Sequence, residues 1–191
     1  MSCPTRSLCG MGTRIVTAFE RFDRAELRFC RYLNRPSGLP TPRAFFKAVS
    51  RLGDGWVWYA LILSQLLLPG GGFAAAHLAL TGGIGLLAYK LIKRHAVRER
   101  PFITHPTISC AAAPLDRYSF PSGHTLHAVS FAILGAHHLP ELAAPLAAFA
   151  LLVALSRVVL GLHYPTDVAA GALLGGGLAL GSLRIADMLA L

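Results

Sequence analysis

Three short clusters of polar residues interrupt an otherwise apolar sequence, and their residue types suit the transfer of a phosphoryl group. The clusters read KRHAVRERP, PSGH and SRVVLGLHYPTD. An imidazole can serve as a nucleophile or a general acid, and a nearby carboxylate can fix its tautomer. Guanidinium and ammonium groups bind phosphate oxygens. Because polar residues beside membrane-length apolar runs are costly to keep, we interpret all three clusters as candidate functional residues.

The first and third clusters supply three cations that could neutralise one phosphoryl group, namely Lys93, Arg100 and Arg157. The second cluster predicts the start of a helix, with Ser122 as the N-cap. Free backbone N–H groups there would face an anion, and Gly123 would let it approach closely. Each feature also has a purely structural interpretation, because basic residues at the end of a span often contact lipid headgroups or set topology. Only the combination favours a site.

His163 and Asp167 are four residues apart around Pro165, a spacing that suits the first turn of a helix. The carboxylate could then orient the imidazole and raise its basicity. His124 supplies a second imidazole, so that one histidine can act as nucleophile and the other as acid. His127 lies one helical turn from His124 and could touch the same site. A lone histidine or aspartate at a helix end is more often a satisfied polar group, and it is the three clusters together that argue for chemistry.

The rest of the chain predicts an integral membrane protein. Of its 191 residues, 54% are hydrophobic and 14% are charged, whereas an average soluble domain carries roughly 25% charged residues. These values exclude an ordinary soluble domain and, more firmly, a disordered tail. The net charge of +9 would suit nucleic acid, a membrane surface or a phosphorylated substrate. The long apolar runs exclude the nucleic-acid class, because such proteins do not need segments that cross lipid.

Five apolar segments predict an all-α, polytopic membrane bundle with about five transmembrane helices. A helix needs about 20 apolar residues to cross the hydrocarbon core. The first segment is too short alone, and we expect it to extend upstream with Lys47 and Arg51 reaching the surface. The chain would leave through the third span and return through the fourth, so all three clusters would share one membrane face. The predicted spans are Trp56–Leu68, Phe73–Ile92, Ser122–His138, Ala143–Leu160 and Val168–Leu183.

Several other residues are interpreted as structural or peripheral. We expect Asp116 and Arg117 to form a local ion pair in a loop, and Tyr118 and Phe120 to line a substrate entrance. Four glycines in the last span have small-xxx-small spacing, which lets helices approach closely. The four cysteines form no CxxC pair, so neither a disulfide nor a zinc site is expected. The glycines are Gly171, Gly175, Gly177 and Gly181, and the cysteines are Cys3, Cys9, Cys30 and Cys110.

Residues 1–55 form a basic, amphipathic N-terminal region, which we separate from a transmembrane domain over residues 56–191. Apolar residues recur at helical spacing on one face and arginines on the opposite face, as is typical of helices that lie in the bilayer interface. A helix packed on the protein's own membrane core would show the same pattern, and Glu26 within the apolar face counts against the interfacial alternative. The apolar residues are Ile15, Phe19, Phe22, Phe29 and Leu33, and the arginines are Arg14, Arg21, Arg24, Arg28 and Arg31.

The three clusters together resemble the signature of the type-2 phosphatidic acid phosphatase superfamily, which reads Lys-x6-Arg-Pro, Pro-Ser-Gly-His and Ser-Arg-x5-His-x3-Asp. All eleven fixed residues are present in this order, and the resemblance covers roughly residues 73–185. It implies that His163 forms a phosphohistidine, that Asp167 orients His163, and that His124 protonates the leaving alcohol. It also implies that no metal or other cofactor takes part. The phosphoryl oxygens would be held by Lys93, Arg100, Ser122, Gly123 and Arg157.

The resemblance further implies a lipid phosphate as substrate, with membrane lipids as partners. Phosphatidate, phosphatidylglycerol phosphate and a polyprenyl (pyro)phosphate all fit, and the sequence does not choose among them. A lipid phosphotransferase would use the same phosphohistidine with another acceptor. A non-enzymatic lipid-binding or transport protein would explain the charges but not the catalytic spacings. The related vanadate-dependent haloperoxidases share the signature but are soluble, which the apolar spans argue against.

The distribution of cations bears on which membrane face holds the site. Ten of the 18 Lys and Arg residues precede the first predicted span, on the side of the three clusters, and only Arg184 clearly falls opposite. The positive-inside rule therefore favours a site that faces the cytoplasm, in the plasma (inner) membrane. Members of the superfamily commonly have six spans and a site facing outward. This chain lacks a clear first span, so the two indications conflict.

Overall fold

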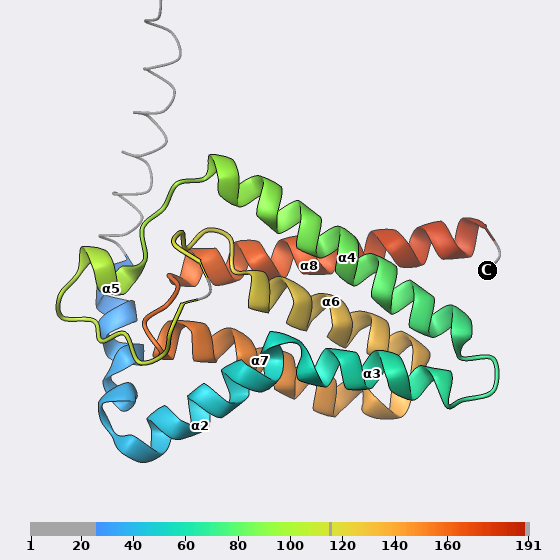
Figure 1. Ribbon diagram of the computed structural model, residues 1–191, viewed down its shortest axis with the longest axis horizontal. Helices are drawn as coiled ribbons and strands as arrows, with labels where there is room; N and C mark the ends of the chain where they lie inside the picture. The colour runs from blue at the N-terminus through green and yellow to red at the C-terminus, as the bar shows by residue number, and fades with distance from the viewer. Residues whose placement is uncertain (1–25, 115, 190–191) are drawn as a thin grey trace, which may run out of the picture.

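The computed structural model describes residues 26–114 and 116–189, which form helices and loops without any strand. The long helices lie side by side along the longest axis of the molecule (Figure 1). The predicted all-helical bundle is therefore confirmed. After the helical residues 26–34, the elements are η1 (Arg35–Gly38), α2 (Pro40–Arg51), η2 (Leu52–Trp56), α3 (Val57–Leu66), α4 (Gly72–His95), α5 (Pro101–Thr104), α6 (Gly123–His138), η3 (Pro140–Leu142), α7 (Ala143–Val159) and α8 (Pro165–Met188).

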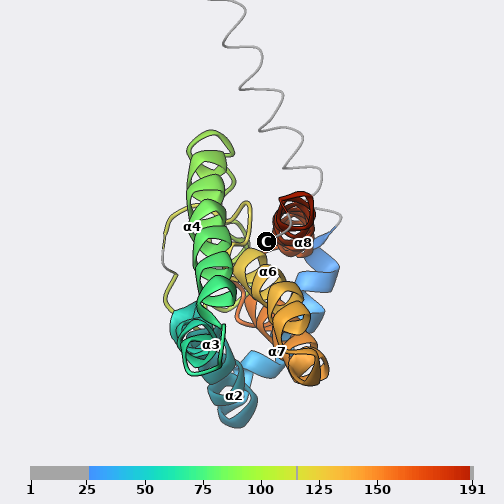
Figure 2. The same ribbon diagram turned by 90° about the vertical axis from the view of Figure 1, so that its right-hand side faces the viewer.

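Helix α6 is the centre of the bundle and packs on α4, α7 and α8, as the end view shows (Figure 2). The ends of these helices bring the polar clusters together. Helix α6 starts after its N-cap Ser122, whose side chain accepts from the backbone N–H of Thr125, and α8 starts with Pro165 in its first turn. Helix α4 ends just after Lys93, and α7 just after Arg157. All three clusters therefore lie at one end of the bundle, as predicted.

Three helical segments within the described residues are long and apolar enough to cross a membrane. They are Gly72–His95, Pro140–Val159 and Pro165–Met188, with mean hydropathies of 1.4, 2.1 and 1.5. Helix α6 has 16 residues and α3 has 10, both short of the roughly 20 residues that a full span needs. The membrane character of the fold is thus supported, while the number of five spans stays a prediction.

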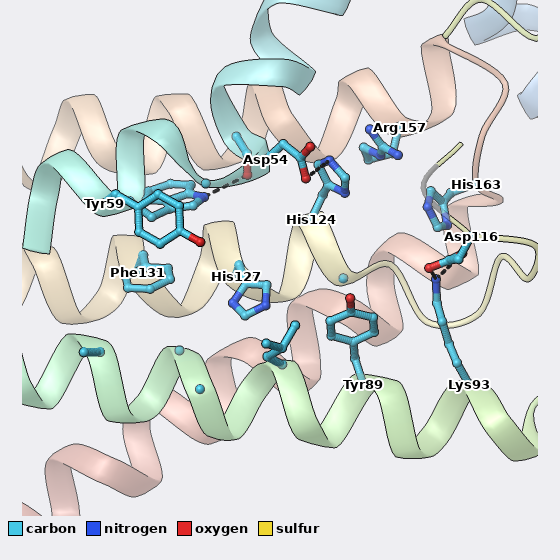
Figure 3. A pocket seen from close by; sticks show the side chains of 18 of the residues that line it. Asp54, Tyr59, Tyr89, Lys93, Asp116, His124, His127, Phe131, Arg157 and His163 are labelled. Carbon is cyan, nitrogen blue, oxygen red and sulfur yellow. Dashed lines mark hydrogen bonds and ion pairs between the residues drawn. The ribbon is translucent and has the colours of Figure 1, made fainter. Parts of the chain in front are cut away.

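The first predicted span extends upstream, as expected, although not as a straight helix. Helices α2 and α3 are joined through η2, a turn of π-helix, and the run bends at Gly55, whose φ is 135°. A residue with a side chain rarely adopts such a φ, so glycine is required at this bend. The bend turns the η2 segment toward the polar end of α6 (Figure 3).

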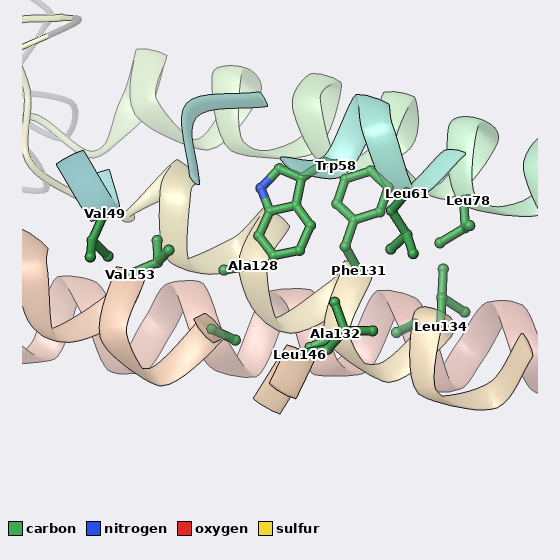
Figure 4. Close-up of a cluster of buried hydrophobic side chains, with 12 residues drawn as sticks. Val49, Trp58, Leu61, Leu78, Ala128, Phe131, Ala132, Leu134, Leu146 and Val153 are labelled. Carbon is green, nitrogen blue, oxygen red and sulfur yellow. The ribbon is translucent and has the colours of Figure 1, made fainter. Parts of the chain in front are cut away.

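The apolar core lies between α3, α6 and α7 (Figure 4). The indole of Trp58 stacks on Phe131, with ring centroids 5.4 Å apart and an interplanar angle of 7°. Leu61, Leu134 and Leu146 complete this layer and are buried. These contacts fix α3 against α6 and so hold η2 in place at the site end.

Helices α6 and α8 touch through glycines. A Cβ on Gly171 would lie 2.5 Å from the carbonyl oxygen of Ser122, and one on Gly175 would lie 2.2 Å from that of Leu126. No side chain fits at either position, so the predicted packing role is confirmed for these two. It is wrong for Gly177 and Gly181, which have no described residue within 4 Å of where a Cβ would lie, because they lie on faces of α8 that none of the described helices approaches.

The described part of the N-terminal region packs on the protein itself. Cys30 is buried in a cluster with Ile108, Val158 and Tyr164, and Leu27 and Leu33 pack against that cluster. The side chain of Asn34 donates to the backbone carbonyl of Val159 at 2.9 Å. Phe29 is exposed. Residues 26–34 therefore favour the core-packed alternative, whereas Ile15, Phe19 and Phe22 lie outside the described residues. The division at residue 55 stays a prediction.

Candidate active site

A cavity of about 370 Å³ lies where the three polar clusters meet (Figure 3). Its walls come from η2, α3, α4, α6, α7 and the loops before α5, α6 and α8. Of the eight residues predicted to form the site, Ser122 and Asp167 do not line the cavity but are fully buried. The other six line it, and they are Lys93, Arg100, Gly123, His124, Arg157 and His163.

His163 is held by a tight turn between α7 and α8. Its backbone N–H donates to the carbonyl of Arg157 at 3.1 Å. Gly161 in this turn has a φ of 73°, and a Cβ there would lie 2.5 Å from the carbonyl oxygen of Ser109. Glycine is therefore required both for the backbone conformation and for the close approach of the neighbouring loop. This backbone leaves the His163 side chain little freedom.

The imidazole of His163 has two distinct sides. Its Nε2 lies 3.3 Å from Nη1 of Arg100, and its Nδ1 lies 3.6 Å from Oδ2 of Asp167. The second distance is longer than a hydrogen bond, and catalytic hydrogen bonds often tighten only when substrate binds. Burial and the charges of Arg157 and Arg100 hold the pKa of His163 well below its ordinary range. The ring is therefore neutral near pH 7, as a nucleophile requires.

Asp167 is fixed from two directions. Oδ1 accepts from Nη1 of Arg98 at 2.6 Å, and Oδ2 accepts from the backbone N–H of Tyr164 at 2.8 Å. The guanidinium of Arg98 also lies over the Tyr164 ring, 4.0 Å from its centroid. Both Arg98 and Asp167 are almost fully buried. The carboxylate beside His163 thus has little freedom to turn.

Arg98 and Glu26 are site-supporting residues that the sequence analysis missed. Nη2 of Arg98 lies 3.1 Å from Oε2 of Glu26, whose Oε1 accepts from the backbone N–H of Thr166 at 2.9 Å. Two signals could have found them. Arg98 lies between Lys93 and Arg100 in the first cluster, and Glu26 interrupts an apolar helix face, where a carboxylate needs a partner.

Two of the predicted phosphate-binding cations share one carboxylate. Nζ of Lys93 lies 2.7 Å from Oδ2 of Asp116, and Nη2 of Arg100 lies 2.7 Å from Oδ1. Arg100 also donates to the carbonyl of Leu162 at 2.7 Å. Burial alone would raise the pKa of Asp116, but the hydrogen bonds and charges of Lys93 and Arg100 outweigh it and hold the pKa below its usual value. The carboxylate is therefore ionised and neutralises part of the charge of both cations.

The expected local pair between Asp116 and Arg117 is wrong. Arg117 instead pairs with Glu99 at 2.9 Å, on the exposed side of the loop, because neighbouring side chains in a loop seldom face one another. Tyr118 and Phe120, expected at the entrance, do not line the cavity. The Tyr118 ring lies near the Arg117 guanidinium, 5.6 Å from its centroid, at this exposed position.

Arg157 is the buried cation of the cavity. Its Nη1 donates to the hydroxyl of Ser50, whereas its Nε has no hydrogen-bond partner among the described residues. A buried, unsatisfied guanidinium N–H is costly unless a ligand completes it. Because Arg157 and His163 line the same cavity, an anion bound there could supply this partner.

The start of α6 contributes unequally to the site. The Ser122 hydroxyl lies within hydrogen-bond distance of Thr125 Oγ1, at 3.0 Å, and caps the helix, so it does not face the cavity. Gly123 does line the cavity, and a Cβ there would meet the Tyr89 ring at 3.3 Å. His124 and His127 also line it. The wall therefore includes Gly123 and both histidines, while the serine supports it from behind.

The far part of the cavity is apolar. It runs between α3, α4 and α6 and is lined by Trp58, Ile62, Leu86 and Phe131. Gly83 faces open space there, with no atom of residues 26–114 or 116–189 within 4 Å of where a Cβ would lie. Within the described residues, no three His, Cys, Asp or Glu side chains are grouped to hold a metal ion. The arrangement can thus hold an anionic head beside His163 and an apolar chain beyond it.

Comparison with known proteins finds phosphatases among the relatives of this chain. The undecaprenyl-diphosphatase BcrC of Bacillus subtilis is 36% identical over 115 residues, which cover 59% of this chain and 59% of BcrC. The decaprenylphosphoryl-5-phosphoribose phosphatase of Mycolicibacterium smegmatis is 38% identical over 149 residues, 71% of this chain and 74% of that protein. The matched part of this chain thus spans less than two thirds of BcrC.

Solved structures agree in fold. The crystal structure of Aquifex aeolicus LpxE superposes with a TM-score of 0.75 at 27% identity, over 84% of this chain and 95% of that chain. A transmembrane PAP2-type phosphatidylglycerolphosphate phosphatase from Bacillus subtilis gives a TM-score of 0.70 at 20% identity, over 93% and 96% of the two chains, and shows the shared fold. Residues 73–190, more than half of the chain, match the PAP2 superfamily. The expected resemblance is confirmed, and this membrane protein belongs to the PAP2 superfamily.

Proposed function

We propose that the chain is a lipid phosphatase of the membrane that removes a terminal phosphoryl group through a phosphohistidine on His163. The observation that carries this proposal is the position of His163 Nε2, which lies 3.3 Å from Arg100 in a cavity also lined by Lys93 and Arg157. A neutral nucleophile surrounded by three cations suits an incoming phosphate dianion. The phosphatase relatives named above support the reaction class.

In the first step, Nε2 of His163 attacks phosphorus in line with the leaving oxygen. The N–P bond forms while the P–O bond to the lipid breaks, and His124 gives its proton to the leaving oxygen. The positive charge on the His163 ring is stabilised by Asp167, which Arg98 holds in place. Lys93, Arg100 and the unpartnered Nε of Arg157 bind the phosphoryl oxygens as charge builds up.

In the second step, water attacks the phosphohistidine. His124, now neutral, takes a proton from the water while the N–P bond breaks, and inorganic phosphate leaves. The imidazole of His163 returns to its neutral state, as its burial favours. Both histidines thus end the cycle as they began it, and no external proton carrier other than water is needed.

The shape of the cavity supports an amphiphilic substrate. Its cations lie at one end, and apolar side chains between α3 and α4 line the other end. Two relatives act, by their names, on undecaprenyl diphosphate and on a decaprenyl-linked phosphoribose. Among the lipid phosphates considered, we therefore propose a polyprenyl (pyro)phosphate first, ahead of phosphatidate and phosphatidylglycerol phosphate.

The test is phosphate release from a panel of these lipids in detergent with EDTA, comparing the wild type with His163→Ala. Metal-independent release that His163→Ala abolishes, together with acid-labile label from a ³²P substrate on the wild type alone, would support the proposal. Release that survives in His163→Ala would refute the nucleophile. Transfer to an added alcohol without release to water would replace the hydrolase by the phosphotransferase.

We also propose that the site faces the cytoplasm, on the basis of the N-terminal cations. Cys110 is exposed and free and lies in the loop between α5 and α6, at the site end of the bundle. In a variant with Cys3 and Cys9 replaced by serine, an impermeant maleimide should label Cys110 only after the cells are opened. Labelling of intact cells would place the site on the outer face.

A further inference from the structure

A carboxylate that the sequence analysis did not single out lies against the second histidine. Oδ1 of Asp54 is 3.3 Å from Nε2 of His124, and both residues line the cavity. Figure 3 shows His124 with Asp54 on one side and with Arg157 and His163 on the other. The pair joins η2 to the start of α6, two segments far apart in the sequence.

The backbone of η2 is built to hold Asp54 at this place. A Cβ on Gly53 would lie 2.6 Å from Cγ2 of Val153, so η2 approaches α7 as closely as glycine allows. The carbonyl of Gly53 accepts from the indole N–H of Trp58 at 2.9 Å. Gly55, with its φ of 135°, then turns the chain into α3. Contacts on both sides of Asp54 thus fix its backbone against the bundle.

The contact with His124 contributes little to stability. The Asp54 side chain is 42% exposed, and an ion pair at such a position typically adds little to stability. A carboxylate in contact with an imidazole nitrogen fixes which nitrogen carries the proton and stabilises the protonated ring. The pair is therefore better suited to proton transfer than to stability.

We propose that Asp54 is a positioning residue that fixes the tautomer of the acid His124, an inference that rests on the proposed function. With Nε2 held toward the carboxylate, Nδ1 is the nitrogen left for the substrate. Nδ1 gives its proton to the leaving oxygen as the P–O bond breaks, and it takes a proton from water as the N–P bond breaks. Asp54 stabilises the imidazolium that precedes the first transfer and follows the second.

The leaving group separates this role from a structural one. Dodecyl phosphate has a poor leaving group that needs a proton, whereas 4-dodecyl-2-nitrophenyl phosphate has the same chain length and a phenolate that leaves without one. A positioned general acid contributes about 10²- to 10⁴-fold, and loss of the carboxylate that supports it should remove part of this. We expect Asp54→Asn to lower kcat/KM by about 10- to 100-fold on dodecyl phosphate and by less than about 3-fold on the nitrophenyl ester.

A double-mutant cycle completes the test. If Asp54 acts through His124, then adding Asp54→Asn to His124→Ala should change neither rate further. Asp187→Asn, an exposed charge change at the far end of α8, is the matched control and should leave both rates unchanged. Equal losses on both esters, additive losses in the double variant, or faster turnover by Asp54→Asn would overturn the inference. If the wild type hydrolyses neither ester, the proposed function fails, which is a distinct result.

Discussion

Two of the histidines that line the cavity, His163 and His124, each face a carboxylate, but the two pairs are built differently. His163 and Asp167 belong to adjacent turns of the chain and are both buried. Asp167 is further bound by Arg98 and by the backbone of Tyr164. His124 and Asp54 come from distant segments, the Asp54 side chain is 42% exposed, and no second ion pair holds it among the described residues.

The difference matches the roles that we propose for the two histidines, His163 as nucleophile and His124 as acid. The nucleophile needs a fixed ring with its lone pair at Nε2 and no proton there, so a buried and immobile carboxylate serves it. The acid must lose and regain a proton in every cycle, so a partner in contact with solvent serves it. The histidine–aspartate pair is thus buried and immobile at His163 and partly exposed at His124. Removal of the carboxylate should therefore affect activity differently in the two pairs.

The largest expected effect is that of Asp167→Asn. The amide can present its NH2 group to Nδ1 of His163 and favour the wrong tautomer, which would remove the lone pair from the attacking nitrogen. Loss of the carboxylate that orients a catalytic histidine can cost about 10³- to 10⁴-fold in kcat. Stopped-flow or steady-state assays should show this loss equally on the alkyl and the nitrophenyl ester, in contrast to Asp54→Asn. If the loss of activity in Asp167→Asn were larger on the alkyl ester than on the nitrophenyl ester, Asp167 and Asp54 would have the same kind of role, and the contrast between the two pairs would be wrong.

Arg98→Gln should have the next largest effect, and mainly on stability. It leaves the buried Asp167 and the partly buried Glu26 without their cation, and breaking a buried pair such as Arg98–Asp167 typically costs about 3–5 kcal/mol. Thermal unfolding in detergent should show a clear fall in Tm, together with a loss of activity. Arg94→Gln, at an exposed position near the end of α4, is the control and should leave Tm unchanged. An unchanged Tm in Arg98→Gln would mean that Asp167 is not locked.

The sequence predicted the parts of the site that depend on residues close together in the chain. The spacing of His163 and Asp167 and the N-cap at Ser122 are local properties of helix starts, and helix packing then places Lys93 and Arg157 beside them. The prediction that all four glycines of α8 mediate helix packing was too broad, because small-xxx-small spacing does not show which face of a helix a neighbour covers. Gly171 and Gly175 meet α6, whereas Gly177 and Gly181 meet no part of the chain that the structure describes.

The parts that the sequence did not predict depend on contacts between distant segments. Asp54 reaches His124 only because the chain bends at Gly55, and Asp116 reaches Lys93 across the loop that precedes α6. No spacing rule relates these positions. Arg98 was overlooked for another reason, since charged residues near a span end are usually solvated, and only the fold shows that this one is buried.

Titration of His163 should show the effect of its locked environment. Its pKa is lowered by burial first and then by Arg157 and Arg100, so the ring should stay neutral at pH values below the ordinary value of about 6.5. Below that value the unfolded chain binds a proton that the folded protein refuses, so stability should fall as the pH drops. Imidazole ¹³C NMR can follow the ring, with the signal identified by its absence in His163→Gln. A pKa of His163 near the ordinary value would show that water reaches the His163–Asp167 pair.

The smallest effect is expected for Asp116→Asn, and it concerns a carboxylate that holds cations instead of a histidine. Asp116 binds both Lys93 and Arg100, so a bound phosphate would have to displace it or share both cations. Removing a partly exposed charge of this kind should change binding by about 0.5–1 kcal/mol, or about 2- to 5-fold. The inhibition constant of inorganic phosphate should fall by this factor in Asp116→Asn, whereas Asp187→Asn should leave it unchanged. A rise instead would show that Asp116 orients the two cations for phosphate more than it competes with it, and the carboxylate would then resemble Asp167 in fixing its partners in place.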